Sequence, residues 1–216
     1  MLHNLSAKNS IANQFIAELR DVKIQKDRMR FRQNVVRLGE IFAYEISKTF
    51  TYVLEERETP LGIANVKIPQ DKIVIACVLR AGLPLHQGLL NYFDQADNAF
   101  VAAYRRHHKD GTFEINLEYM TCPDLEGKIL ILADAMLATG ASFEAVLKGI
   151  EKQGTAKKIH LVTIIGSTQG VNYIKRIFPK VDIWCGAIDE ELTAKSYIVP
   201  GLGDAGDLLF GEKLQE

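Results

Sequence analysis

Apolar and polar positions alternate along this chain in blocks that predict strands and helices in turn. The run Ile129–Ala133 is apolar at every position, which is typical of a central parallel strand covered on both faces. Farther along, residues 143–150 carry apolar side chains at i, i+3, i+4 and i+7, the spacing of a helix with one buried face. A strand that leads directly into an amphipathic helix is the repeating unit of an α/β sheet.

The same two patterns recur over most of the chain. Helical spacing predicts a short helix over residues 11–19 and a longer one from 31 to about 48, whereas residues 50–69 are β-prone and broken by prolines, as in a hairpin or arm. Strands are then expected at 73–79, 100–104, 129–133, 159–165 and 181–187, and helices near 83–93, 143–152 and 171–177. This alternation predicts an α/β fold with a mainly parallel sheet flanked by helices. Residues 109–123 interrupt it and predict a second β excursion, a hairpin beside or over a ligand site.

Composition limits the class of protein. A chain of 216 residues suits one domain, 1–216, and its formal net charge of -1 argues against a dedicated binder of nucleic acid or anionic membranes. The sequence has no signal-peptide pattern and no apolar run long enough to span a bilayer. Cys77, Cys122 and Cys185 are far apart and odd in number, which argues against disulfides or a zinc site. We therefore expect a cytoplasmic protein that acts on small molecules.

Residues 134–142, the phosphate loop, join the strand 129–133 to the helix that follows. The backbone N–H groups from Thr139 to Ser142 lie at the expected helix N-terminus, where they lack intrahelical partners and where the helix dipole favours an anion. Asp134, directly after the strand, is placed to accept hydroxyl groups of a sugar. The alternative is an ordinary turn in which Thr139 or Ser142 only caps the helix. On the first interpretation the ligand carries a phosphate and a ribose.

Residues 197–207, the glycine loop, form a second unusual segment. Gly201, Gly203 and Gly206 satisfy G-x-G-x-x-G, but too few residues follow for the βαβ unit of a dinucleotide site. Glycines here allow close main-chain approach to a flat ligand, and backbone N–H and C=O groups can read a pyrimidine edge. The alternative is a simple turn before a last helical turn. Arg80 and Arg105, at strand ends, are either pyrophosphate ligands or surface ion-pair partners.

Both loops resemble those of a known family. The phosphate loop resembles the D-P-M-L-A-T-G-G-S loop that binds phosphoribosyl diphosphate (PRPP) in uracil phosphoribosyltransferases, and the glycine loop matches their uracil loop, Y-I-V-P-G-L-G-D-A-G-D, over eleven residues. Arg80-Ala81-Gly82 and Tyr104-Arg105 resemble the family's R-A-G and Y-R segments. The resemblance covers nearly the whole chain. It implies the type I phosphoribosyltransferase fold, with N-terminal helices and a β-arm or hood.

The resemblance also implies roles for individual residues. Catalytic roles would fall to Arg80, Arg105, Asp134 and Asp204. PRPP would be bound by Arg80, Arg105, Asp134, Ala135, Met136, Leu137, Ala138, Thr139, Gly140, Ala141, Ser142 and Asp204, and uracil by Ile198, Gly203, Asp204 and Ala205. Mg²⁺ would arrive with PRPP, without direct protein side-chain ligands. A homodimer or larger assembly, and GTP as an effector in some members, are further implications.

The implied reaction converts uracil and PRPP to UMP and diphosphate, a step of pyrimidine salvage. Transfer to another base, or a PRPP- or UMP-binding regulator with weakened catalysis, are the alternatives. Three departures from the family pattern bear on this choice: Ala135 replaces a proline, Ala141 a glycine and Leu208 an arginine. At position 141, a need for positive φ or for very close approach of the phosphate would lower the affinity for PRPP, whereas a helical conformation would make alanine harmless or favourable.

Overall fold

The computed structural model describes residues 1–107 and 113–213, with the backbone alone for 103–107 and 113–116. Its centre is one sheet in which every neighbouring pair of strands is parallel except the last pair, β5 and β6. The strand order is β1 (Leu2–Asn4), β10 (Asp182–Asp189), β9 (Lys158–Ser167), β7 (Ile129–Ala133), β4 (Ile73–Leu79), β5 (Asp97–His107) and β6 (Phe113–Thr121), and the short β8 (Met136–Leu137) also pairs with β9. The expected α/β fold with a mainly parallel sheet is confirmed.

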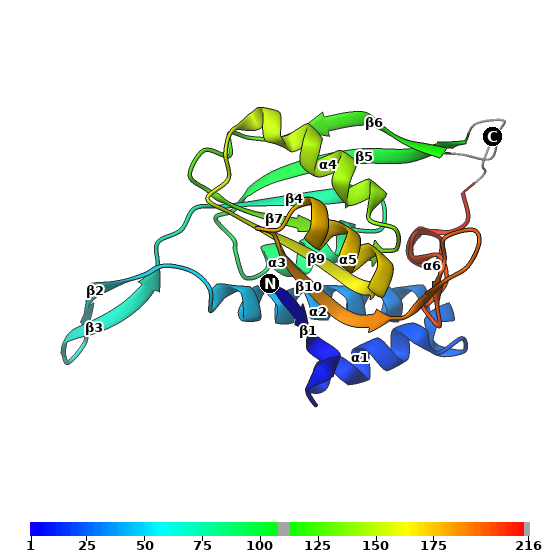
Figure 1. Cartoon of the computed structure of the whole chain (residues 1–216). Coiled ribbons are helices and arrows are strands. Elements are labelled where there is room, and N and C mark those ends of the chain that lie inside the picture. The colour runs from blue at the N-terminus through cyan, green and yellow to red at the C-terminus, as the bar shows by residue number, and fades with distance from the viewer. Residues whose placement is uncertain (108–112, 214–216) are drawn as a thin grey trace.

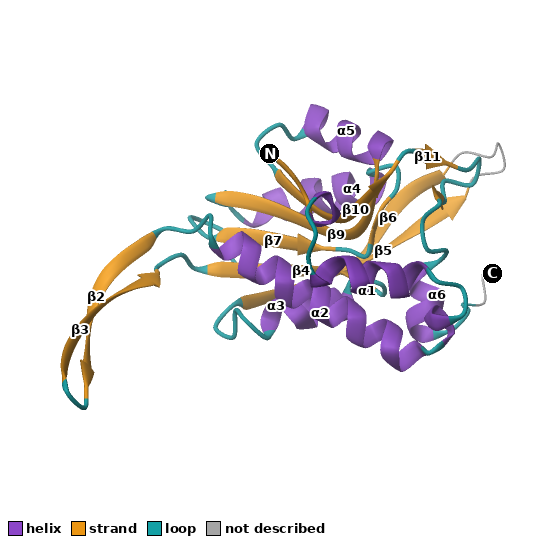
Figure 2. Ribbon diagram, turned by 90° about the horizontal axis from the view of Figure 1, so that it is seen from below, coloured by secondary structure: helices purple, strands orange, loops and turns teal. Residues whose placement is uncertain are grey.

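Helices cover both faces of this sheet (Figure 1). One layer consists of α4 (Ala141–Ile150) and α5 (Thr168–Ile177), and the other of α1 (Ile11–Arg20), α2 (Arg28–Ser47) and α3 (Leu83–Leu90). Figure 2 shows α1, α2 and α3 from their own side of the sheet. Single 3₁₀ turns lie at Leu5–Ala7, Ile24–Lys26 and Glu151–Gln153. In the part of the chain that the structure describes, none of the helices combines the length and the apolar character needed to cross a membrane.

The central strands β4 and β7 are apolar at every position because both of their faces are buried. In β7, Ile129, Ile131 and Ala133 pack into the cluster that contains α1, α2 and α3. Leu130 and Leu132 point the other way, into the cluster of α4 and α5. All five residues are at most 2% exposed. Two-sided burial therefore explains why β7 lacks the polar alternation of a half-exposed strand.

The segment predicted as a hairpin or arm is a two-stranded antiparallel ribbon, β2 (Tyr52–Thr59) and β3 (Gly62–Pro69). It forms a sheet of its own and projects away from the helices and the main sheet in both ribbon views (Figures 1 and 2). Leu61 at its tip is fully exposed, and Leu54 and Ile63 are more than half exposed. The arm prediction is confirmed, and the arm carries apolar side chains that this chain does not cover.

The second β excursion is part of a hairpin at the edge of the main sheet. β6 pairs with β5 in antiparallel register and extends the main sheet at its edge, so the two strands form a hairpin within the sheet. Residues 108–112 of the predicted segment lie outside the described residues. The N-terminal strand β1 was not predicted, because three residues carry no periodic pattern and their order comes from pairing with β10. The stacking of His3 on Trp184 at 3.7 Å between ring centroids fixes this pairing.

Candidate active site

The predicted site residues gather at the carboxyl ends of the parallel strands. Arg80 follows β4 and Asp134 follows β7, and these strands are paired neighbours. Gly82 lies so close to the end of β7 that a Cβ atom would be 2.6 Å from the carbonyl oxygen of Ala133. Figure 1 shows α6 (Ala205–Phe210) beyond these strand ends and the arm at the opposite end of the sheet. This edge is where ligands bind in open α/β sheets.

Within the phosphate loop, Gly140 has φ of 89° and caps α4. A Cβ atom on Gly140 would lie 2.9 Å from Cδ1 of Tyr173, so both its backbone conformation and its space favour glycine. Ala141 is the first residue of α4, and among the described residues other than glycine only Ser196 has positive φ. Ala141 therefore needs no positive φ, and on that ground alanine is harmless at this position.

Buried residues hold the phosphate loop from below. Ala135 and Leu137 have no exposed surface, and Met136 and Leu137 form β8 against β9. The carbonyl oxygen of Ala135 accepts hydrogen bonds from the N–H groups of Ile164 and Ile165, at 3.0 and 3.3 Å. Ala135 and Leu137 therefore anchor the loop, whereas other members of the loop are partly exposed. These are Asp134, Met136, Ala138, Thr139, Ala141 and Ser142.

The start of α5 fixes the phosphate loop from the side. The Ser167 hydroxyl donates to the carbonyl oxygen of Ala138 and accepts from the N–H of Gly170 at 2.8 Å. A Cβ atom on Gly170 would lie 2.3 Å from the same oxygen. Our sequence analysis missed these two residues. A serine between a predicted strand and a predicted helix signals an N-cap, but nothing in the sequence indicates its contact with Ala138.

The glycine loop begins in a short strand and ends in a capped helix. β12 (Ile198–Val199) pairs with β11 (Glu191–Leu192), and Ile198 is buried. Gly203 has φ of 96°, and Leu208 lies beneath it, since a Cβ atom there would be 3.9 Å from Cδ1 of Leu208. Leu208 therefore packs against the loop in place of the family's arginine. Ala205 is the buried first residue of α6, a helix too short for a dinucleotide-binding unit, as predicted.

Asp204 caps α6 and is one of the two aspartates of the glycine loop. Its Oδ1 accepts the Asp207 N–H at 3.0 Å, and its Oδ2 pairs with Nζ of Lys213 at 3.1 Å. Burial works to raise the pKa of Asp204, but the Asp207 N–H and the Lys213 ammonium outweigh it, so the pKa lies below its ordinary value. Asp204 is therefore a carboxylate at neutral pH.

An ion pair joins the segment after β4 to the glycine loop. Nη2 of Arg80 lies 3.2 Å from Oδ1 of Asp207, and the Arg80 side chain is 44% exposed. Burial and the negative charge of Asp134 together raise the pKa of the Cys77 thiol, in β4, to about 12. Arg80 and Asp207 thus lie together at a partly exposed surface.

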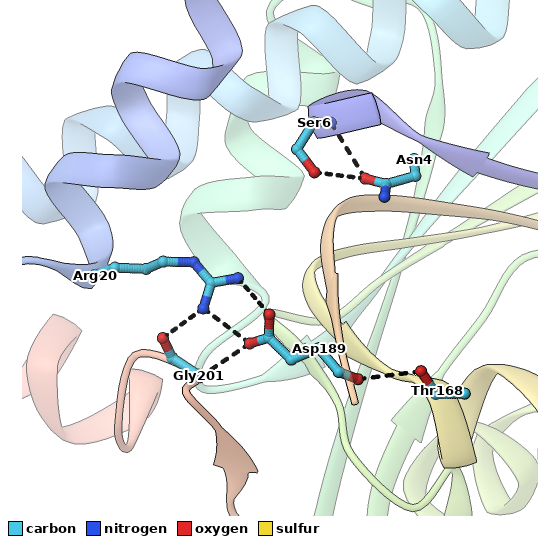
Figure 3. Close-up of polar contacts among 6 residues, drawn as sticks. All are labelled: Asn4, Ser6, Arg20, Thr168, Asp189 and Gly201. Carbon is cyan, nitrogen blue, oxygen red and sulfur yellow. Dashed lines mark hydrogen bonds and ion pairs between the residues drawn. The ribbon is translucent and has the colours of Figure 1, made fainter. Parts of the chain in front are cut away.

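Asp189, the last residue of β10, is a further residue that the sequence did not reveal. Its carboxylate binds Arg20 and accepts the N–H of Gly201, and Figure 3 shows these contacts together. The residues come from α1, β10 and the glycine loop, so their contact depends on the tertiary fold. Arg105 lies in β5 opposite Ile115, but its side chain is outside the described residues.

A metal ion has no complete protein site in the part of the chain that is described. No group of three or more histidine, cysteine, aspartate or glutamate side chains there is arranged to hold one. The carboxylates of Asp134 and Asp204 are hard oxygen donors, the type that Mg²⁺ accepts alongside phosphates and water.

Comparison with known proteins agrees with this geometry. The family model described as uracil phosphoribosyltransferase matches residues 6–212. A uracil phosphoribosyltransferase of Porphyromonas gingivalis is 52% identical over 212 residues, covering 98% of each chain, and one of Pyrococcus furiosus is 39% identical over 205 residues, covering 94% of this chain and 87% of that one. The solved structure of the AQ2163 protein from Aquifex aeolicus is 30% identical and covers both chains completely with a TM-score of 0.88. The phosphate loop and Arg80 follow neighbouring strands, and Arg80 is paired with the glycine loop. With this arrangement and with matches of this length, the chain belongs to the uracil phosphoribosyltransferase family.

Proposed function

We propose that this chain transfers the phosphoribosyl group of PRPP to N1 of uracil, giving UMP and diphosphate, at the carboxyl edge of its sheet. The observation that carries the proposal is the ion pair between Arg80 and Asp207, which connects the segment after β4 to the glycine loop. PRPP held at the first segment and uracil held at the second would then be neighbours. Family membership supports the same reaction.

The phosphate loop is proposed to bind PRPP. The N-terminus of α4, with Thr139, Gly140, Ala141 and Ser142, would receive the 5′-phosphate, because backbone N–H groups and the helix dipole favour an anion there. Asp134 would accept the ribose hydroxyls. Arg80 and Arg105 would hold the pyrophosphate through planar, charged N–H groups.

The glycine loop is proposed to bind uracil through its main chain. Ile198, Gly203, Asp204 and Ala205 would offer N–H and C=O groups to the base edge. A mismatched base would leave buried polar groups unpaired, which discriminates against other bases. The support is the rigid geometry of the loop, with positive φ at Gly201 and Gly203 and a capped helix directly after it.

Catalysis in this proposal is a matter of position and charge. As the bond from the anomeric carbon to diphosphate breaks, that carbon becomes oxocarbenium-like. N1 of uracil attacks its opposite face with inversion, and the N1 proton passes to Asp204, water or the departing diphosphate. Arg80 and Arg105 would stabilise the leaving group, and the ionised Asp204 would face the cationic sugar. Mg²⁺ bound to PRPP near Asp134 and Asp204 would supply further charge neutralisation on the diphosphate. We assign no general base.

Further proposals follow from the resemblance and from the shape of the chain. We propose one domain over residues 1–216 and a homodimer, which the projecting arm with exposed Leu54, Leu61 and Ile63 supports. The thiols of Cys77, Cys122 and Cys185 are free, which supports a cytoplasmic location. GTP activation is carried over from the family alone, and addition of GTP to the assay tests it.

The test is formation of UMP from uracil, PRPP and Mg²⁺ by the purified protein, with a panel of free bases in place of uracil. Uracil is expected to be the preferred base by a large margin. Turnover of another base in preference to uracil would replace the proposed substrate. Binding of UMP without any turnover would support a regulatory protein instead.

A further inference from the structure

A buried ion pair braces the glycine loop from behind. Arg20, the last residue of α1, places Nη1 and Nη2 at 2.8 and 2.7 Å from the two carboxylate oxygens of Asp189. The same Nη1 donates to the carbonyl oxygen of Gly201 at 2.8 Å, and Oδ2 of Asp189 accepts the N–H of Gly201 at 2.9 Å. Both polar groups of one glycine are thus bound by the two members of one ion pair (Figure 3).

The surroundings make this contact specific. The side chain of Asp189 is 8% exposed and that of Arg20 is 23% exposed, so the pair is largely removed from water. Only the planar guanidinium can bind a carboxylate with two N–H groups and a carbonyl at once. Gly201 has φ of 57°, and a Cβ atom on it would lie 2.2 Å from the carbonyl oxygen of Ile198. The turn therefore has one tight conformation, held by charged groups.

Asp189 also contacts the structure behind the phosphate loop. Its carbonyl oxygen accepts a hydrogen bond from the Thr168 hydroxyl at 3.3 Å (Figure 3). Ser167, the residue before Thr168, donates its hydroxyl to the carbonyl oxygen of Ala138 in the phosphate loop. The ion pair of Arg20 and Asp189, the brace, is thereby connected to the same turn that positions the phosphate loop.

We propose that Arg20 and Asp189 are positioning residues that set the uracil-reading conformation of the glycine loop without touching a substrate. This inference rests on the proposed function, because it assumes that residues 198–205 bind uracil. Gly201 lies between Ile198 and Gly203, so loss of the brace displaces the main-chain groups on both sides of it. Binding of uracil should suffer more than binding of PRPP.

Steady-state kinetics of Arg20→Gln, Asp189→Asn and the double variant test the proposal. Each single variant is expected to raise the KM for uracil about tenfold or more, with a KM for PRPP within about twofold of wild type, because a buried charged group loses its partner. The double variant is expected to resemble the single ones, since either change already breaks the brace. Arg30→Gln is the matched control, because Arg30 pairs with Glu18 at 3.3 Å and makes no contact with the glycine loop.

Hydrogen exchange supplies a readout independent of turnover. Peptides covering residues 198–206 should exchange faster in both single variants and unchanged in Arg30→Gln. If Arg20→Gln does not fold, Arg20→Lys keeps the charge without the forked geometry and should still raise the KM for uracil. The proposed positioning role is overturned if the variants lower only kcat or thermal stability and keep the wild-type KM for uracil and the wild-type exchange of residues 198–206. A wild type that makes no UMP contradicts the proposed function instead, and the exchange experiment then decides the brace alone.

Discussion

Arg80 donates to Asp207 at 3.2 Å across a sequence separation of 127 residues. The first residue follows a central strand, and the second lies in the first turn of the last helix. A single ion pair therefore links the segment proposed to hold pyrophosphate to the loop proposed to hold uracil. Because both side chains are partly exposed, Arg80 can exchange this partner for an anionic ligand at small cost.

Arg80→Gln is expected to lower kcat/KM for PRPP about 100-fold or more, because it removes a charged donor set from the leaving diphosphate. Asp207→Asn should cost less than about tenfold, since an exposed ion pair contributes little and Arg80 remains. Lys48→Gln, which breaks an exposed pair with Glu45 on α2, is the control for loss of a surface charge. Equal effects of the Arg80 and Asp207 variants would contradict the assigned role of Arg80.

The two neighbours Gly140 and Ala141 should respond in opposite ways to exchange. Gly140→Ala places a Cβ on a residue with φ of 89° and against Tyr173, so we expect a loss of about 1–3 kcal/mol in stability and a higher KM for PRPP. Ala141→Gly should leave activity unchanged and lower stability by at most about 1 kcal/mol, because position 141 is helical. Thermal unfolding and initial rates measure both. A strong gain of activity in Ala141→Gly would show that the phosphate loop is impaired by alanine.

Ser167→Ala removes the hydroxyl that binds Ala138 as well as the cap of α5. We expect a raised KM for PRPP in addition to the loss of about 1 kcal/mol that a missing cap costs. Ser10→Ala is a matched control, because Ser10 caps α1 through the N–H of Ala12 at 3.3 Å. Loss of stability of similar size with a normal KM is expected there. If both variants behave alike, Ser167 has only a capping role.

The free energy of unfolding is expected to decrease as the pH falls from 6.5 to about 4, because of His160. Burial of this fully inaccessible side chain, whose Nδ1 accepts Nε1–H of Trp184 at 3.0 Å, lowers its pKa from 6.5 to about 4. In the unfolded chain His160 binds a proton below pH 6.5, whereas in the folded chain it stays neutral until the pH is about 4. Up to about 3 kcal/mol of stability is therefore lost as the pH falls through this range.

Denaturant unfolding of wild type and His160→Gln between pH 7 and pH 4 measures this effect. The variant should show a shallower decline, although not a flat one, because burial also lowers the pKa values of His3 and His86. Identical declines in the two proteins would exclude His160 as the main source of the pH dependence.

The order of apolar and polar residues was sufficient to predict the layered fold. Two-sided burial requires apolar residues throughout a central strand, so β4 and β7 were predicted at their observed bounds, and one-sided burial placed α1, α2, α4 and α5 to within a few residues. The two loops were also visible in the sequence, because glycines, hydroxyls and an acid at a strand end have few structural uses.

How those loops are held depends on contacts made in the folded chain. The contacts of Arg20 with Asp189, Arg80 with Asp207, and Ser167 with Ala138 join segments far apart in sequence, and none leaves a periodic pattern. The helical state of Ala141 and the pairing of β1 with β10 were likewise set by neighbours. Local patterns record which face of a segment is buried. The partner of a polar side chain depends on which distant segments the fold brings next to it, and a local pattern does not record those segments.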